Sequence, residues 1–351
     1  KAMLTLKPSD LETLLIAVIK AKQNLLVTGS PGIGKTAVFK RAVKNVKAEG
    51  FFMYPSIGDP TDAKGLPWIT NGKATFVPFD ELDRVYQAVE TNRLTALILD
   101  DLGQGLPATQ ASYMSLMDKL RGKCSVIAAT NRRGDKAGVQ GVLEPVKSRF
   151  HSIVELQADL NDFCTHLLDE GEEMYGLSED AILDIVSFLR FCPEHLCSFN
   201  ATADLTNSPC PRLWVSVGQQ ISLNLPAHIE FVSIAGAVGE GVGGVFSSFK
   251  KMRRALPNLD SIFLDPHNAQ IPTEPSVRWA TCTGLASRAT EKNFPSLHIY
   301  AKKLHSAALV QFAVLMVRDA LRKTPEIRET NEFQKLVNSP IGDAIAGTVR
   351  S

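Results

Sequence analysis

The sequence lacks a long apolar run, a strong net charge and a signal peptide, and each absence excludes a class of protein. The longest strongly apolar stretch, residues 307–317, is too short to span a bilayer and is interrupted by Gln311. The amino-terminal residues lack the charged, apolar and small-residue order of a signal peptide, so we expect a cytoplasmic protein without membrane contact. The formal net charge of +1 gives no global field that attracts nucleic acid, although local basic clusters could do so.

A disulfide framework is also lacking, because the cysteines are few and scattered. They lie at positions 124, 164, 192, 197, 210 and 282. This spacing in a chain of 351 residues favours reduced thiols. Cys192, His195 and Cys197 invite a zinc interpretation, but no second ligand pair follows at a recognised spacing. We therefore expect buried thiols and a surface histidine in this segment.

The strongest pattern in the sequence is a phosphate-binding loop of the form G-x-x-x-x-G-K-[ST]. The loop consists of Gly29, Ser30, Pro31, Gly32, Ile33, Gly34, Lys35 and Thr36. An apolar run typical of a buried strand, residues 25–27, precedes it, and residues 37–43 have helical spacing. This strand–loop–helix context distinguishes a nucleotide site from a glycine-rich turn with a stray lysine.

The residue types of the loop suit phosphate chemistry. The glycines let the backbone wrap closely around an anion with its N–H groups pointing inward, and the helix that follows adds the positive end of its dipole. Lys35 supplies a positive charge to the outer phosphates, and Thr36 offers its hydroxyl to a magnesium ion. We predict ATP and Mg²⁺ as cofactors, although phosphate chemistry alone does not separate ATP from GTP.

A second pattern, residues 96–101, is a buried strand that ends in two carboxylates. In open α/β sheets ligands bind at this end of the strands. Asp100 is placed to hold the magnesium ion, and Asp101 to orient or deprotonate the attacking water. The alternative is a capped turn, which the distance of 65 residues from Lys35 to Asp100 in an α/β pattern makes less favourable.

Three further polar residues are candidates for the same site. Asn131 follows an apolar strand and could fix the attacking water from the opposite side, or it could be an ordinary turn residue. Arg149 could be a surface residue, or at a subunit boundary it could stabilise transition-state charge in a neighbour's site. Arg212, on the first turn of a predicted helix, could reach the nucleotide or be solvated.

The remaining pattern predicts an α/β part followed by helices. We expect a helix that Ser9 caps, and a hairpin around Asn71-Gly72 that serves either a contact or as a packed flap. The α/β part should also contain strands at 25–28, 51–54, 96–99, 124–131 and 152–156, and helices at 79–92 and 107–120. Later we expect helices at 161–171, 178–190 and 211–223, a kinked helix at 235–244, a linker at 256–275 and a helical segment at 297–322.

With these motifs the chain resembles the AAA+ ATPases, and within them the MoxR-like branch. Residues 29–36 match the Walker A motif, and residues 96–101 match Walker B. Asn131 is at the sensor 1 position, and Arg149 in Ser-Arg-Phe matches the arginine finger. Residues 208–212 look like the branch's sensor 2, stretched by two residues, with Arg212 as its arginine. Residues 59–67 are similar to the segment before the branch's hairpin insert.

This resemblance, which covers roughly residues 1–225, implies a fold and an activity. The fold is α/β, with a P-loop core around a parallel five-stranded sheet in residues 1–158, an α-helical lid in 159–250, and a linker with a helical C-terminal segment in 251–351. The activity is Mg²⁺-dependent hydrolysis of ATP to ADP and phosphate. Such proteins usually form hexameric rings that remodel a partner protein as chaperones, and MoxR-like members often act on a protein with a von Willebrand A-type domain.

Two other functions remain open from the sequence. A nucleic-acid-directed AAA+ ATPase, of helicase-loader or nuclease-associated type, is suggested by the basic positions 40, 41, 44 and 47 and by Arg132-Arg133. The near-zero net charge and the absence of a recognised DNA-binding motif argue against it. A non-hydrolysing switch is conceivable because Asp101 stands where the family usually has glutamate, one methylene longer.

Overall fold

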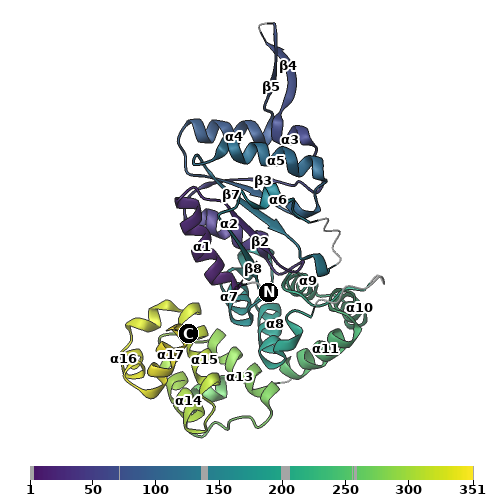
Figure 1. Ribbon diagram of the computed structural model, residues 1–351. Helices are drawn as coiled ribbons and strands as arrows, with labels where there is room; N and C mark the ends of the chain where they lie inside the picture. The colour runs from purple at the N-terminus through teal and green to yellow at the C-terminus, as the bar shows by residue number, and fades with distance from the viewer. Residues whose placement is uncertain are drawn as a thin grey trace. The chain divides into compact units, whose positions relative to one another are not determined.

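The computed structural model describes residues 4–70, 72–135, 141–198, 206–254, 256 and 259–350 (Figure 1). The described residues up to Asp162 form one compact unit, and those from Phe163 onward form a second. Within the described ranges, no helix is both long and apolar enough to cross a membrane.

The first unit is built on a parallel sheet. Its strands, in spatial order, are β1 (Thr5–Leu6), β8 (Ser152–Leu156), β2 (Leu25–Thr28), β7 (Ser125–Thr130), β6 (Thr95–Leu99) and β3 (Glu49–Met53). Every residue of β2, β6 and β7 is buried, as expected for central strands that are covered on both faces. The predicted α/β fold with a parallel sheet is therefore confirmed.

The prediction of five strands is corrected to six. The additional strand, β1, has only two residues and pairs with β8 at the edge of the sheet, with Thr5 opposite Glu155. A run of two residues is too short to show a strand pattern in the sequence. The edge strand leaves the order of the central strands unchanged.

Helices cover both faces of this sheet. They are α1 (Pro8–Lys20), α2 (Lys35–Asn45), α3 (Pro60–Lys64), α4 (Asp80–Glu90), α5 (Pro107–Leu120) and α6 (Glu144–Lys147). One buried cluster joins Phe51 and Leu97 of the sheet to Leu82 of α4 and Leu116 of α5. On α1 the buried residues are Leu11, Leu15, Val18 and Ile19, and Lys7 rather than the predicted Ser9 is the N-cap residue. The Ser9 N–H instead donates to a carboxylate oxygen of Asp162 at 2.7 Å.

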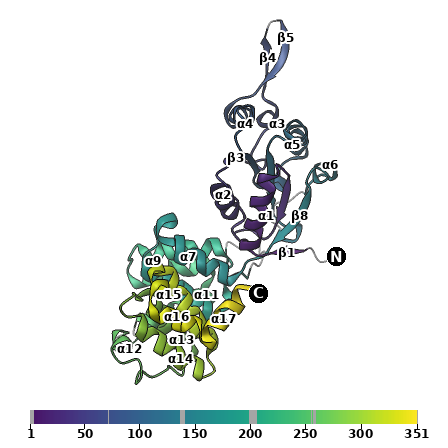
Figure 2. The ribbon, with the colours of Figure 1, turned by 90° about the vertical axis from the view of Figure 1, so that its left-hand side faces the viewer.

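The predicted hairpin is present as the antiparallel pair β4 (Leu66–Thr70) and β5 (Lys73–Val77). It projects beyond α3, α4 and α5 in both views of the molecule (Figures 1 and 2). Gly65 begins it with a φ of 89°, and a Cβ there would lie 2.3 Å from the carbonyl oxygen of Val77. Only glycine therefore allows the chain to enter the hairpin at this point.

The second unit is helical. It contains α7 (Leu160–Tyr175), which starts in the first unit, α8 (Glu179–Phe191), α9 (Pro211–Ser222), α10 (Ala227–Val238), α11 (Glu240–Arg254), α12 (Asp260–Leu264), α13 (Pro275–Ser287), α14 (Phe294–Ser306), α15 (Val310–Lys323), α16 (Asn331–Val337) and α17 (Pro340–Arg350). Three expectations are corrected. The kinked helix is two helices that meet at Gly239, the linker contains α12, and the segment 297–322 is divided between α14 and α15.

Residues on both sides of position 250 share this second unit. The expected boundary there lies inside α11, and α8 packs against α13. Arg190 of α8 pairs with Asp319 of α15 through two hydrogen bonds of 2.5 and 3.1 Å, and each side chain is 4% exposed. A charge pair this deeply buried needs Asp319 in particular, because Arg190 alone would be an uncompensated charge in the core.

Candidate nucleotide-binding site

The phosphate loop, residues 29–36, connects the end of β2 to the start of α2 at the carboxyl edge of the sheet. Gly32 and Gly34 have φ values of 74° and 97°, in the left-handed region that favours glycine. A Cβ on Gly29 would lie 2.6 Å from the Ile33 side chain and 2.9 Å from the backbone oxygen of Leu156. The loop backbone therefore has the close-wrapped conformation that the sequence pattern predicts.

Lys35 lies inside this loop. It is 7% exposed, and its ammonium donates to the backbone oxygens of Gly29 at 2.8 Å and Ser30 at 3.0 Å. A third bond, 2.8 Å long, goes to Oδ1 of Asn131, which follows β7. The structure thus brings together the predicted phosphate-binding lysine and the predicted water-fixing amide.

Thr36 and Asp100 also meet. The Thr36 hydroxyl donates to Oδ2 of Asp100 at 2.7 Å, and the Asp100 N–H donates to the backbone oxygen of Met53 at 2.9 Å. A hydroxyl and a carboxylate at one position are oxygen donors of the kind that Mg²⁺ prefers beside substrate phosphates. The residues therefore fit the magnesium ion that the motifs predict, and the roles of Thr36 and Asp100 as its ligands stay a prediction.

Asp101 follows with an unusual backbone conformation. Its φ and ψ of 56° and 37° lie in the left-handed region, and it begins the 3-10 turn η1 (Leu102–Gln104). Its N–H is 3.2 Å from Oδ1 of Asp100. Among residues other than glycine, aspartate and asparagine adopt this conformation most readily. The local backbone thus gives a physical reason for aspartate at a position where glutamate is usual.

Arg149 lies at the other end of the sheet from the phosphate loop. Its guanidinium pairs with one carboxylate oxygen of Asp118 at 2.6 and 3.0 Å, and this hydrogen bonding lowers the pKa of Asp118. The Arg149 backbone oxygen accepts from the side chain of Asn24, immediately before β2. Since the loop follows β2, a whole strand separates Arg149 from the phosphates that its own subunit would bind.

Arg212 belongs to the second unit and is exposed on the first turn of α9. Pro211 occupies the first helical position, where the missing N–H costs no hydrogen bond. The helix start that the sequence indicates is therefore present. A contact of Arg212 with nucleotide stays a prediction.

Arg132 is a site residue that the sequence suggested only as part of a basic turn. Its guanidinium donates to the hydroxyl of Ser30 in the phosphate loop, to both carboxylate oxygens of Asp135 at 3.0 and 3.1 Å, and to Glu155 at 3.1 Å. The hydrogen bond to Asp135 raises the pKa of Arg132 further. The sequence could have indicated this role, because Arg132 comes directly after Asn131. A residue so close to the end of β7 must lie at the same carboxyl edge of the sheet as the phosphate loop.

No protein-family model matches the chain. The sliding-clamp-loader large subunit of Escherichia phage RB69 is 27% identical over 148 residues, which cover 40% of this chain and only 38% of that protein. The Thermotoga maritima RuvB Holliday junction branch migration motor is 11% identical, with a TM-score of 0.38 over 76% of this chain and 77% of that one. A mutant of the same RuvB gives a TM-score of 0.39 at 12% identity.

The sheet, the phosphate loop and the acidic strand end define the first unit as a P-loop nucleotide-binding fold. The clamp-loader match, together with the motifs, supports the AAA+ ATPase family for this chain. The MoxR-like branch is not confirmed, and the comparisons give no support for a partner with a von Willebrand A-type domain.

Proposed function

We propose that the chain is a Mg²⁺-dependent AAA+ ATPase that works in an oligomer and acts on nucleic acid. The observation that carries the proposal is the sequence likeness to a clamp-loader large subunit, combined with the geometry around Lys35 and Asp100. This choice reverses the preference that the sequence alone gave to a chaperone.

The residues of the site divide the work of hydrolysis. Lys35 and the loop N–H groups bind the phosphates, while Thr36 and Asp100 hold the magnesium ion, which when bound neutralises phosphate charge. Asp101 accepts the proton of the attacking water, and Asn131 orients that water. Because Asn131 bonds the Lys35 ammonium, both phosphate and water are positioned from one edge of the sheet.

A basic face on the first unit is suited to the phosphates of nucleic acid. Lys40 and Lys44 of α2 are exposed one helical turn apart, and Lys47, also exposed, follows the end of the helix. Arg41 between them pairs with Glu12 of α1 and so contributes less free charge. Three exposed lysines close together in the chain give a local positive charge that the net charge of +1 does not reveal.

The proposal is tested by measuring ATP hydrolysis with and without single-stranded and primed DNA at several salt concentrations. We expect DNA to stimulate turnover, with an apparent affinity that falls steeply as salt rises. Lys40→Gln, Lys44→Gln and Lys47→Gln together should lower the slope of log affinity against log salt by about 0.9 for each lysine that contacts phosphate. Lys335→Gln, in the second unit, is the matched control. ATPase activity that ignores DNA under all conditions would contradict the proposal.

A second candidate function is a chaperone-like motor that grips protein, as the MoxR-like resemblance implies. The observation that favours it is the exposed hairpin, on which Trp68 is 68% and Phe76 is 59% exposed. Aromatic side chains in such positions bury a large area at low entropic cost when a partner covers them. Pull-downs with ATP present and hydrolysis blocked distinguish the two functions by whether protein or DNA is recovered.

A further inference from the structure

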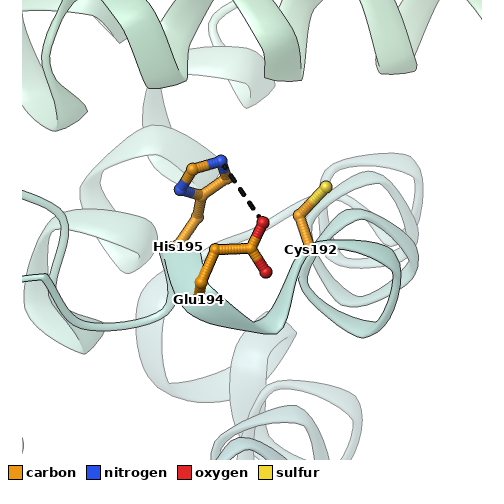
Figure 3. A group of neighbouring side chains, drawn as sticks. All are labelled: Cys192, Glu194 and His195. Atoms are coloured by element: carbon orange, nitrogen blue, oxygen red, sulfur yellow. Dashed lines mark ion pairs between the residues drawn. The ribbon is translucent and has the colours of Figure 1, made fainter.

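Three side chains of different chemistry lie together at the carboxyl end of α8, in the second unit. Cys192, Glu194 and His195 each offer one ligand atom, and these atoms all lie within 4.8 Å of one another. Figure 3 shows the three side chains on the same side of the turn, with the Glu194 carboxylate between the imidazole and the thiol. Nε2 of His195 is 3.9 Å from Oε1 of Glu194.

The backbone that carries these residues is held at several points. The Cys192 N–H donates to the backbone oxygen of Phe188 at 2.7 Å, which closes the last turn of α8. Pro193 then starts the 3-10 turn η3 (Pro193–His195), in which the His195 N–H donates to the Cys192 oxygen at 3.1 Å. A ligand pair three residues apart on a tight turn is the arrangement by which short zinc-binding segments present two donors.

The imidazole of His195 is also fixed from outside the turn. Its ring stacks on Phe188, with 5.9 Å between centroids and an interplanar angle of 10°. The buried Trp214 of α9 donates its indole N–H to the His195 backbone oxygen at 2.8 Å. These contacts hold the histidine in place, so little conformational freedom is left for a ligand to remove.

We propose that Cys192, Glu194 and His195 form a binding site for a divalent transition metal, with Zn²⁺ the ion that the donors suit best. A thiolate, an imidazole and a carboxylate together favour Zn²⁺ over Mg²⁺ or Ca²⁺, which prefer oxygen alone. The two negative donors would balance the charge of the ion. Three protein ligands leave the fourth tetrahedral position to water or to a group from a partner.

The geometry requires only a small adjustment. Donor atoms around a tetrahedral zinc ion lie about 3.5 Å apart, as follows from metal–ligand distances of about 2.0 to 2.3 Å. The three donors here must therefore close by roughly 1 Å from their limit of 4.8 Å. Glu194 can supply the movement of its own carboxylate, because its side chain is 66% exposed and has three rotatable bonds. Any closing of Cys192 toward the fixed imidazole requires rotation of the thiol about its Cα–Cβ bond. An exposed Glu–His pair without a metal contributes little stability by itself.

The third ligand differs from the one that the sequence suggested. Cys197 was the obvious partner of Cys192 and His195 by residue type, but the group that the structure assembles contains Glu194 in its place. Cys192 and Cys197 have similar intermediate burial, so one can serve as a matched control for the other.

The test uses the full chain after treatment with a chelator and with a non-thiol reductant that keeps its cysteines reduced. Titration with Co²⁺ should produce the near-ultraviolet charge-transfer band of a cobalt–thiolate bond and the visible bands of tetrahedral cobalt, and Zn²⁺ should then abolish both. Cys192→Ser should remove the charge-transfer band, whereas Cys197→Ser should keep it. His195→Gln should weaken Co²⁺ binding by more than about tenfold, since it removes a direct ligand rather than an outer partner.

Three results would overturn the proposal. The first is a wild-type chain that gives no thiolate charge-transfer band at Co²⁺ in excess. The second is a band that survives Cys192→Ser and disappears in Cys197→Ser, which would place the thiolate ligand elsewhere. The third is a band with the same affinity in His195→Gln as in the wild type. None of these readouts depends on ATP hydrolysis, so the metal site and the proposed function can fail independently.

Discussion

At the scale of single residues, Asp101 combines a predicted catalytic role with a restrictive backbone. Asp101→Asn keeps a residue type that accepts a φ of 56° but removes the group that can take a proton. We expect this variant to bind ATP normally and to hydrolyse it about 10² to 10⁴ times more slowly. Single-turnover hydrolysis and nucleotide titration measure the two effects separately. Normal turnover would mean that another group is the base.

The opposite substitution, Asp101→Glu, tests the backbone argument. Glutamate would restore the reach that is usual at this position, but it adopts the left-handed conformation several-fold less often than aspartate. We expect a loss of about 1 kcal/mol in unfolding free energy, which is the several-fold conformational preference expressed as an energy. We expect no gain in turnover. Denaturant unfolding and ATPase rates measured on the same preparations check this, and a faster, equally stable variant would contradict it.

Arg132 is the residue for which the structure adds most to the sequence. It joins Ser30 of the phosphate loop to Asp135, which is 7% exposed, and to Glu155 of β8. Arg132→Ala leaves the buried carboxylate of Asp135 without this cation, so we expect weaker nucleotide binding and a loss of about 1 to 3 kcal/mol in stability. Arg132→Lys should recover part of both. A nucleotide affinity unchanged in Arg132→Ala would show that the loop does not need this contact.

At the scale of elements, the strands with uniformly buried sequence were predictable and the ends of helices were less so. Strands β2, β6 and β7 read as continuous apolar runs because both of their faces are covered. The start of α1 was assigned to a Ser9 cap, yet the Ser9 N–H is taken by Asp162, 153 residues away. Local capping patterns cannot reveal such a distant partner. The strand β1 was missed for the same reason, because it forms only by pairing with β8, about 150 residues later in the chain.

The exposure of the hairpin formed by β4 and β5 predicts that its aromatic residues contribute less to stability than an aromatic residue in the core. Trp68→Ala and Phe76→Ala should change unfolding free energy by less than about 0.5 kcal/mol, because both side chains are exposed. Trp214→Ala, in which a fully buried side chain is removed, should cost about 3 to 5 kcal/mol. Thermal and denaturant unfolding compare the three variants. A large loss on changing Trp68 would mean that the hairpin packs against its own chain.

At the scale of the whole molecule, Arg149 predicts how subunits cooperate. Because it lies at the amino end of the sheet, beside Asn24, and the phosphate loop lies at the carboxyl end, we expect the arginine to serve a neighbour's site after leaving Asp118. Arg149→Ala should bind ATP normally and lose turnover by about 10³ to 10⁵, the usual contribution of an arginine finger. Mixing it with Asp101→Asn should restore activity where one subunit supplies the arginine and the other the carboxylate. Rings that mix without recovery would argue for Arg132 or Arg133.

The site as a whole was predictable to the extent that parallel strands share an edge. All four residues follow the carboxyl end of a parallel strand. For this reason Thr36 meets Asp100, and Lys35 meets Asn131, at one edge of the sheet. The network around Arg132 depends on how residues 131–135 turn back over the loop, and spacing does not encode that.

The buried pair of Arg190 and Asp319 has a consequence for the stability of the second unit. The two residues are 129 positions apart in the chain, and each buried charge is compensated by the other. Separating α8 from α15 would leave the Arg190 guanidinium without its partner, at a cost of several kcal/mol, whereas Asp319 would keep Arg322 at 3.6 Å. The pair therefore joins α8 to α15 within the second unit. A truncation near residue 250 would remove Asp319 and leave Arg190 of α8 without its partner, so we expect it to destabilise the helices that remain.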